Sequence, residues 1–250
     1  MEVKNVGGGA SMSNPHRYAS PARQAGSSGV AAAEVTPDVP VPRTLLLWLT
    51  CGVAGTVIFP LIYLIEGATR PGFDAWRQTI SALSLGPDGW IQRANFIMLG
   101  VVVIWLAFVW SRILGGGSGA TWYPIMRGVE GVGLIAIGIV TRDPLHTVLM
   151  VGIVTAMCVS LVVIARRLWS ESNLRRWAVF TLVCGLWPNV LMPFFGVALS
   201  SHGLLGGYAG LLERLATNAD TVWGAVLLIP LWAGSRLMRA GAPAGAAPRH

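Results

Sequence analysis

The sequence predicts an all-α protein, a bundle of six transmembrane helices, and two observations support this prediction. Hydrophobic residues make up 54% of the chain and charged residues only 12%, whereas a soluble domain has about 25% charged residues. The chain also contains six long apolar runs, each about the 17–25 residues that a helix needs to cross a hydrocarbon core. The runs cover residues 44–65, 90–110, 123–140, 147–168, 177–199 and 220–238.

The apolar runs predict helices because backbone polar groups inside a bilayer must be satisfied within the segment, unless strands close into a barrel. A barrel strand alternates apolar and polar residues, but residues 101–106 are apolar at every position. We therefore expect one transmembrane domain over residues 43–239. The flanking residues 1–42 and 240–250 are rich in Gly, Ala, Ser and Pro, which predicts disordered cytoplasmic tails.

The distribution of basic residues predicts that both termini face the cytoplasm. Loops on the cytoplasmic side of a membrane carry an excess of Lys and Arg. With the N-terminus inside, thirteen of the 18 Lys and Arg residues fall on the inner side, including Arg127, and five fall on the outer side. The loop at 166–176 alone contributes four of the thirteen. We expect a multi-pass protein of the plasma membrane.

The first outer loop shows the pattern of a short amphipathic helix near residues 73–83. Its apolar residues recur every three or four positions, at Phe73, Trp76, Ile80 and Leu83. The polar residues between them take the opposite face, at Asp74, Arg77, Gln78 and Ser81. This pattern predicts a helix lying flat on the outer leaflet. In the third outer loop, a similar pattern predicts a helical segment at 208–218 that leads into the last apolar run.

Glu130 is an acidic residue deep within an apolar run, about 10 Å from the start of the run at 1.5 Å per residue. A carboxyl group at this depth needs a partner, a proton or water, so it should face the bundle interior. Two interpretations remain open: a proton carrier, general acid or cation partner, or a structural carboxyl group that bonds a neighbouring helix. Arg127 lies three residues earlier on the same helix, a spacing that favours an ion pair.

The short hairpin between the third and fourth runs contains Asp143 and His146. Asp143 followed by Pro144 is typical of a helix start, because Asp can cap a helix and Pro fits its first position. His146 beside Asp143 could instead act as a general base or a metal ligand. A metal would need further ligands from other loops, so we predict neither a metal site nor a cofactor.

Further polar residues gather near the predicted outer face, where the second apolar run begins and where the first and third outer loops lie. We expect them to form one outward-facing polar mouth together with Asp143 and His146. The residues predicted to bind a ligand there are Asp74, Arg77, Ser81, Gln92, Arg93, Asn95, Glu213 and Arg214.

Several other classes of function are disfavoured. All three cysteines, Cys51, Cys158 and Cys184, lie within apolar runs, which argues against a disulfide framework or a zinc knuckle. The net charge of +7 comes from arginines beside apolar runs and not from a basic face with interleaved aromatic residues, so no nucleic-acid partner is expected. The sequence contains no Gly-x-Ser-x-Gly elbow, no His-Glu-x-x-His motif and no Walker-type phosphate loop.

Four phrases of the sequence together resemble a known family. They are Asp74-x-x-Arg77-x-x-Ile80-Ser81-x-Leu83, Gly89-Trp90-Ile91-Gln92-x-x-Asn95-Phe96 with Gly100, Asp143-Pro144 with His146, and Gly210-Leu211-Leu212-Glu213-Arg214 followed by Trp223. The chain resembles, over residues 45–238, the bacterial and archaeal membrane family known as domain of unknown function 998 (DUF998). The resemblance implies about six helices with polar positions at one face, in a bacterial plasma membrane. It implies no particular activity.

Three classes of function remain open from the sequence. The first is a protein that binds a lipid-like or amphiphilic molecule, with the head group in the outer polar mouth and the chain beside the fifth helix. The second is a membrane-embedded hydrolase or cyclase of amphiphilic substrates that uses Glu130, Asp143 and His146 as acid, orienting group and base. The third is a transporter, for which one copy of six helices would need to form a homo-oligomer. We expect the first, with membrane lipids as partners.

Overall fold

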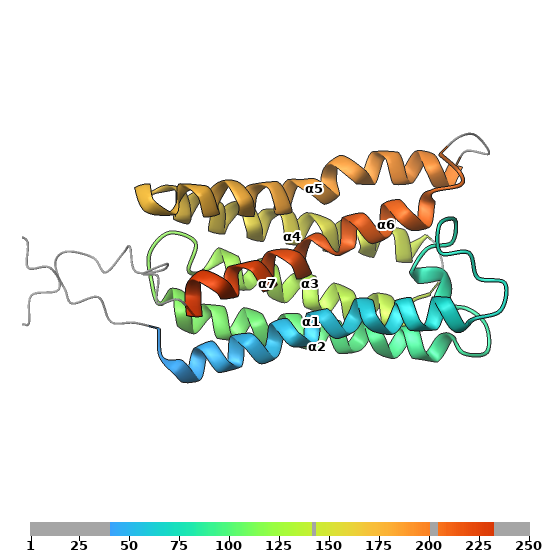
Figure 1. Cartoon of the computed structure of the whole chain (residues 1–250), viewed down its shortest axis with the longest axis horizontal. Helices are drawn as coiled ribbons and strands as arrows, with labels where there is room; N and C mark the ends of the chain where they lie inside the picture. The colour runs from blue at the N-terminus through green and yellow to red at the C-terminus, as the bar shows by residue number, and fades with distance from the viewer. Residues whose placement is uncertain (1–40, 142–143, 201–204, 233–250) are drawn as a thin grey trace, which may run out of the picture. The chain divides into compact units, whose positions relative to one another are not determined.

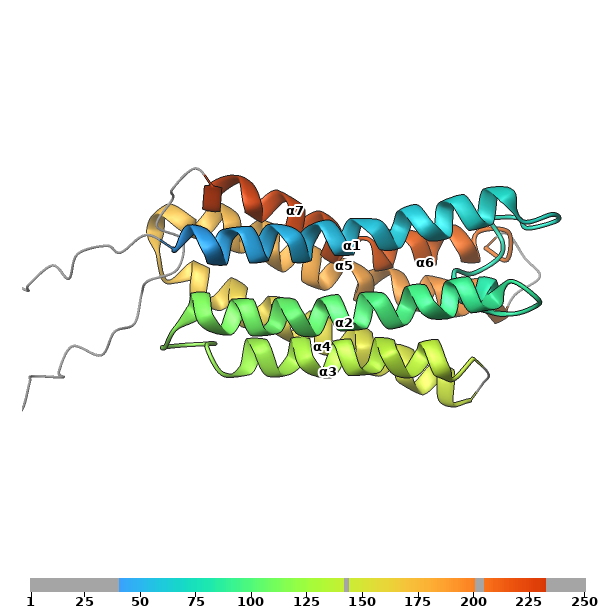
Figure 2. The same cartoon turned by 90° about the horizontal axis from the view of Figure 1, so that it is seen from below.

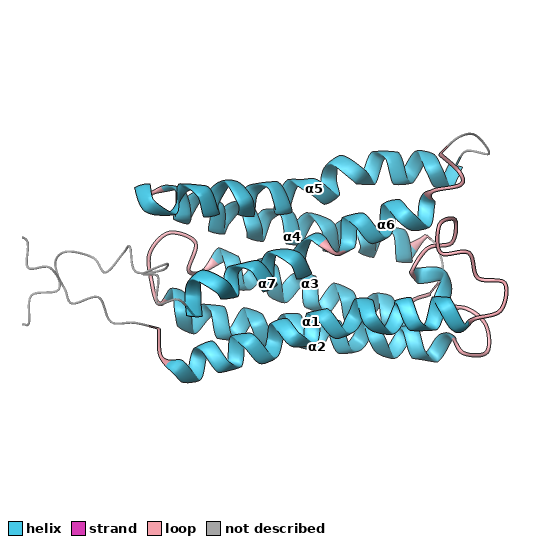
Figure 3. Cartoon of the chain, in the orientation of Figure 1, coloured by secondary structure: helices cyan, strands magenta, loops and turns pink. Residues whose placement is uncertain are grey.

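The computed structural model describes residues 41–141, 144–200 and 205–232, and these residues form helices joined by short loops (Figure 3). The all-α prediction is confirmed. The predicted tails lie outside the described residues, apart from residues 41 and 42. The elements of the described part are α1 (Arg43–Thr69), η1 (Ser81–Ser84), α2 (Gly89–Leu114), α3 (Trp122–Ile139), α4 (Leu145–Trp169), η2 (Ser172–Leu174), α5 (Arg175–Ser200), α6 (Ala209–Thr217) and α7 (Ala219–Trp232), where η marks a 3-10 helix.

Four helical segments of the described chain are long and apolar enough to cross a membrane: α1, α2, α4 and the segment Ser172–Ser200 that contains α5. Their outward surfaces expose large apolar side chains, such as Ile65, Val101, Val151 and Val183. A soluble monomer rarely exposes apolar surface on this scale, but lipid chains cover it without cost. The chain is a multi-pass integral membrane protein.

The remaining helices are shorter. In α3 the apolar sequence is interrupted by Arg127 and Glu130, both of which are buried. The short helix α6 confirms the helical segment predicted at 208–218, and α7 continues from it along the bundle (Figure 1). With α6 and α7 counted together, the described residues form six α-helical segments, of which four are candidate membrane spans. Six membrane passes remain a prediction from the sequence.

The helices form a closed ring. Each of α1 to α5 packs against the next along the chain, and α7 packs against both α5 and α1. The first residues of α1 and the last described residues of α7 lie at the same end of the bundle (Figures 1 and 2). We call this the inner end, as the arginine distribution predicts, and the end that carries α6 and the loop at 70–88 the outer end.

The predicted interfacial helix at 73–83 is wrong. Residues 70–80 form turns, and only Ser81–Ser84 form a single 3-10 turn. Ile80 and Leu83 are fully buried in the outer half of the bundle core, where they pack with Phe59 and Tyr63 of α1. The loop therefore folds inward over the bundle at Ile80 and Leu83, while Trp76 stays exposed.

The loop is not helical because α6 takes its backbone hydrogen-bonding groups. The Arg214 guanidinium donates from Nη1 to the carbonyl oxygens of Ala75 and Gln78, at 2.7 and 3.0 Å. The Glu213 carboxylate accepts the backbone N–H of Ile80. These bonds to a segment more than a hundred residues away replace the local bonds that a helix would need.

The arrangement of the two ends can be tested with single cysteines. In a background with Cys51, Cys158 and Cys184 replaced, we expect Asp88→Cys to react with a membrane-impermeant maleimide in intact cells. Ser172→Cys should react only after permeabilisation, because the loop before α5 is predicted to be cytoplasmic. Both positions are exposed, so access from water decides the result. Labelling of Ser172→Cys in intact cells would reverse the orientation.

Candidate functional site

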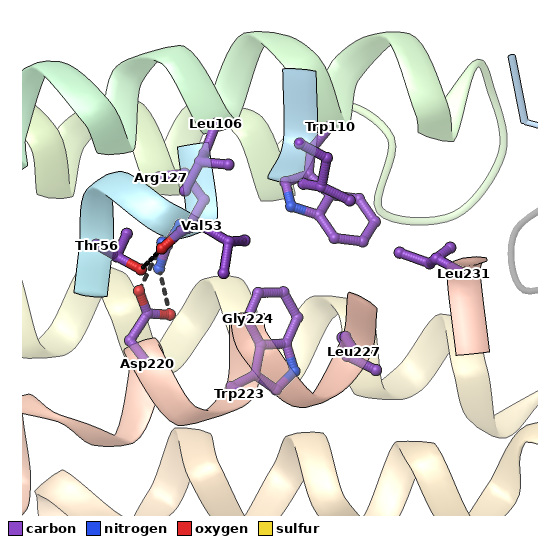
Figure 4. A pocket seen from close by; sticks show the side chains of 11 residues that line it. Val53, Thr56, Leu106, Trp110, Arg127, Asp220, Trp223, Gly224, Leu227 and Leu231 are labelled. Carbon is purple, nitrogen blue, oxygen red and sulfur yellow. Dashed lines mark hydrogen bonds and ion pairs between the residues drawn. The ribbon is translucent and has the colours of Figure 1, made fainter. Parts of the chain in front are cut away.

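A charged cluster lies inside the ring and joins α3 to α7. Arg127 donates from Nη1 and Nη2 to the two carboxylate oxygens of Asp220, at 2.8 and 2.7 Å (Figure 4). The same Nη1 donates to Oε2 of Glu130 at 2.9 Å. Such two-point bonding between a guanidinium and a carboxylate gives strong, well-oriented hydrogen bonds.

The sequence positions this cluster through helix geometry. Arg127 and Glu130 are three residues apart on α3, so they share one helix face, and Asp220 lies in the first turn of α7. Arg127 is 1% exposed and Glu130 is 4% exposed. The pairing of Arg127 with Glu130 agrees with the spacing. The placement of Arg127 at the inner interface, which the charge count assumed, is wrong because Asp220 holds the guanidinium inside the bundle.

On the inner side of the cluster lies a layer of three aromatic residues, Trp110, Tyr123 and Trp223. All three are buried, and their ring centroids are 5.6 to 6.3 Å apart. The indole N–H of Trp223 donates to the Thr181 hydroxyl at 3.0 Å. Figure 4 shows Trp110 and Trp223 beyond the Arg127–Asp220 pair, on the side of Leu231. The cavity here measures only about 10 Å³, roughly the lower limit for one water molecule.

On the outer side of the cluster the ring encloses a central cavity of about 60 Å³. Glu130 and Asp220 lie at its wall, and every α-helix contributes to its lining. Most of the lining is apolar, with the methionines Met150, Met157 and Met192 among it. A volume of this size can hold a few water molecules.

A larger outer cavity of about 400 Å³ adjoins the central cavity. Four residues line both, namely Met150, Val154, Met192 and Glu213. The polar side chains of the outer cavity come from the loop at 70–88, from α4, α5 and α6, and are Thr79, Ser81, His146, Thr147, Thr155, Asn189 and Glu213. A path lined by these residues therefore leads from the outer end of the bundle towards Glu130 and Asp220.

His146 is the residue of the predicted catalytic group that lines the outer cavity. Its Nδ1 lies 2.8 Å from the carbonyl oxygen of Val140. Its Nε2 is buried and has no hydrogen-bond partner among the described residues. Asp143, its predicted neighbour, lies outside the described residues. One nitrogen of the ring is thus positioned by the Val140 carbonyl group just after α3, and the other is unpaired among the described residues.

Of the eight residues predicted to bind a ligand, the outer cavity brings together Ser81 and Glu213. Asp74 and Arg77 are exposed and form an ion pair of 3.5 Å with each other. Arg93 is also exposed and donates to the Gly89 carbonyl oxygen. These three charged side chains do not line either cavity.

Gln92 and Asn95 are buried between α1 and α2. The Asn95 amide donates to the carbonyl oxygen of Phe59 and to Oε1 of Gln92, each at 3.1 Å. Gln92 Nε2 and Asn95 Oδ1 are buried and have no hydrogen-bond partner within the described residues. The pair links the two helices and lies outside the lining of the outer and central cavities.

Glu213 and Arg214 hold the first outer loop against α6, as described above. Gly210 permits this contact, because a Cβ there would lie 2.2 Å from the Gln78 carbonyl oxygen and 2.5 Å from that of Ala75. Two of the sequence phrases used for the family resemblance, at 74–83 and 210–214, therefore meet in space. The Arg214 guanidinium donates hydrogen bonds to the loop backbone, whereas Glu213 also lines both cavities.

The sequence analysis missed Asp220, Thr79 and Asn189 as site residues. Asp220 begins the last apolar run, so its position in the chain suggested the outer surface. The structure places it deeper because α6 forms the outer part of this pass and α7 begins inside the bundle. The apolar residues of α6, such as Leu211 and Leu215, were the signal in the sequence that the last helical segment begins before Asp220.

Comparison with known proteins gives one match. A family model described as "Protein of unknown function (DUF998)" matches residues 53–230. No curated protein and no solved structure matches the chain. The match spans most of the described helices, from α1 to α7, and includes the residues of both cavities.

Proposed function

The chain belongs to the DUF998 family, whose function is unknown, and on that premise we propose from its cavities that it binds a lipid-like amphiphile. The observation that supports this most directly is the pair of adjoining cavities. The outer cavity offers hydroxyl, imidazole, amide and carboxyl groups, and the central cavity is mostly apolar. A volume of about 400 Å³ lies within the usual range for small-molecule sites, roughly 300–1,000 Å³.

The lining of the outer cavity favours a particular head group. Among the described residues, it contains the carboxyl group of Glu213 and the imidazole of His146 but no Lys or Arg. An anionic head group would lack a fixed cationic partner among these lining residues and would face a carboxyl group. A head group with hydroxyl or amine donors matches Glu213, Asn189 and the threonines. We propose a neutral or amine-bearing head group. The hydrocarbon chain would pass Met150 and Met192 and point towards the central cavity.

An enzyme that uses Glu130, Asp143 and His146 is the second candidate. It would require Glu130 and His146 to act on one bond, but Glu130 lines the central cavity and His146 lines the outer one. The orphaned Nε2 of His146 is the observation that favours it. Transport by an oligomer is a third option. Binding of an amphiphile uses both cavities as they stand, so we prefer it.

Filling the region where the two cavities meet tests the proposed binding. Met192→Trp places a large ring where the two cavities meet, and we expect it to reduce co-purification of the bound amphiphile strongly. Untargeted lipid mass spectrometry of the protein, purified in mild detergent, measures this. The matched control is Val190→Trp on the same helix, because Val190 points outward and is 56% exposed.

Two results would reject the proposal. One is a wild-type protein that carries no lipid-like species above the level of an unrelated membrane protein purified in the same way. The other is equal loss of the bound species in the Met192→Trp and Val190→Trp variants, which would place the amphiphile on the outer surface. His146→Ala should weaken retention only partly if the protein binds without catalysis. Near-total loss of an activity would support the enzyme instead.

A further inference from the structure

The charged cluster of α3 and α7 has an unequal number of opposite charges. Arg127 supplies one positive charge, and Glu130 and Asp220 supply two carboxyl groups. If both carboxyl groups were ionised, one net negative charge would remain inside the membrane domain. Such a charge is costly in a low-dielectric interior unless a proton, a cation or water compensates it.

The surrounding helices offer no second fixed cation. The other titratable side chains near the cluster are Tyr123 on α3 and Cys184 on α5. Glu213 of α6 lines the same cavity and adds another acid, while His146 of α4 lies in the outer cavity. The described residues therefore supply no second positive charge to compensate the cluster.

The cavities on the two sides of the cluster differ in size. On the inner side the aromatic layer of Trp110, Tyr123 and Trp223 leaves about 10 Å³. On the outer side the central cavity of about 60 Å³ reaches Glu130 and adjoins the outer cavity. The guanidinium Nε of Arg127 is also buried and has no hydrogen-bond partner in the described part of the chain. Arg127 lines the small inner cavity, where this donor offers a position for one ordered water molecule, whereas Glu130 and Asp220 line the central cavity.

We propose that Glu130 is a proton-exchange site, filled from the outer end of the bundle through water in the two cavities. A hydronium ion in the central cavity gives its proton to a carboxylate oxygen of Glu130, forming the O–H bond and leaving a neutral water molecule. Arg127 then keeps its two-point bond to Asp220, and the carbonyl oxygen of the protonated Glu130 still accepts from Nη1. Uptake of one proton makes the cluster neutral.

A proton fits this site better than a metal ion. Among the described residues, no group of three or more His, Cys, Asp and Glu side chains is arranged to hold a metal. Within the cluster, Asp220 has both oxygens engaged by Arg127, whereas Glu130 has only Oε2 bonded to Arg127 and also lines the central cavity. This inference concerns the protein with water in both cavities and does not require the proposed amphiphile.

Infrared difference spectroscopy of the protein in lipid nanodiscs tests the site. Between about pH 5 and 9, we expect the C=O band of a protonated carboxylic acid to weaken as the pH rises. Glu130→Gln should remove the Glu130 component of this change, while Glu66→Gln and Glu213→Gln, which alter other buried acids, should preserve that component. Asp220→Asn should also abolish it, because Arg127 and Glu130 then form a balanced ion pair and Glu130 stays ionised.

The route is tested by deuterium exchange of the same band. Met192→Trp should slow the exchange and Val190→Trp should not, because Met192 lines both cavities and Val190 lines neither. The proposal is overturned if no component of the band is lost in Glu130→Gln, or if the component that is lost never titrates. Unchanged exchange in Met192→Trp would reject the outer route. None of these readouts requires the proposed amphiphile, so the two proposals can fail separately.

Discussion

Replacing Arg127 by alanine is expected to prevent stable folding of the membrane domain. The guanidinium is the partner of two buried carboxyl groups and bonds α3 to α7. Removing one member of a buried ion network typically costs about 3–5 kcal/mol, because the remaining charges are left uncompensated. We therefore expect little monodisperse protein after size-exclusion chromatography in detergent, and a strongly lowered melting temperature for what remains.

The controls separate the loss of charge balance from the loss of an arginine. Arg112→Ala removes an exposed guanidinium near the inner end of α2 and should leave stability almost unchanged. The triple variant Arg127→Gln, Glu130→Gln and Asp220→Asn removes all three charges together and should recover much of the stability, since neutral replacements of buried networks are often tolerated. If Arg127→Ala alone melted like the wild type, the cluster would have no structural role.

Replacing Gly131 by leucine is expected to separate α2 from α3. A Cβ at Gly131 would lie 2.7 Å from the backbone carbonyl oxygen of Gly100, and a Cβ at Gly100 would lie 2.5 Å from that of Gly131. Backbone atoms cannot yield as a flexible side chain can. Overpacking of a core typically costs about 1–3 kcal/mol, and a whole leucine against a backbone should exceed that range.

Gly128→Leu is the matched control, on the same helix and one turn earlier. A Cβ at Gly128 meets no atom within 4 Å, so the same side chain should fit against lipid. Thermal unfolding in detergent, followed by tryptophan fluorescence, compares the two variants. Equal melting temperatures for Gly131→Leu and Gly128→Leu would show that the close approach of α2 and α3 is not required. The adjacent Glu130 makes this contact relevant to the site as well.

The sequence determined those features that depend on neighbouring residues along one helix. The apolar runs gave the all-α membrane domain, because a helix in lipid must satisfy its own backbone bonds. The apolar spacing at 208–218 gave α6. The three-residue spacing of Arg127 and Glu130 gave their pairing, because such residues share a helix face.

Only the tertiary structure decided which distant segments complete these features. Asp220 reaches Arg127 across 93 positions of sequence, and no spacing within either helix predicts that contact. The loop at 73–83 has the periodicity of an amphipathic helix, yet Glu213 and Arg214 bind its backbone groups and hold it as turns. The periodicity of a sequence indicates which side chains avoid water. The partner of each polar group depends on which helices become neighbours in the closed ring.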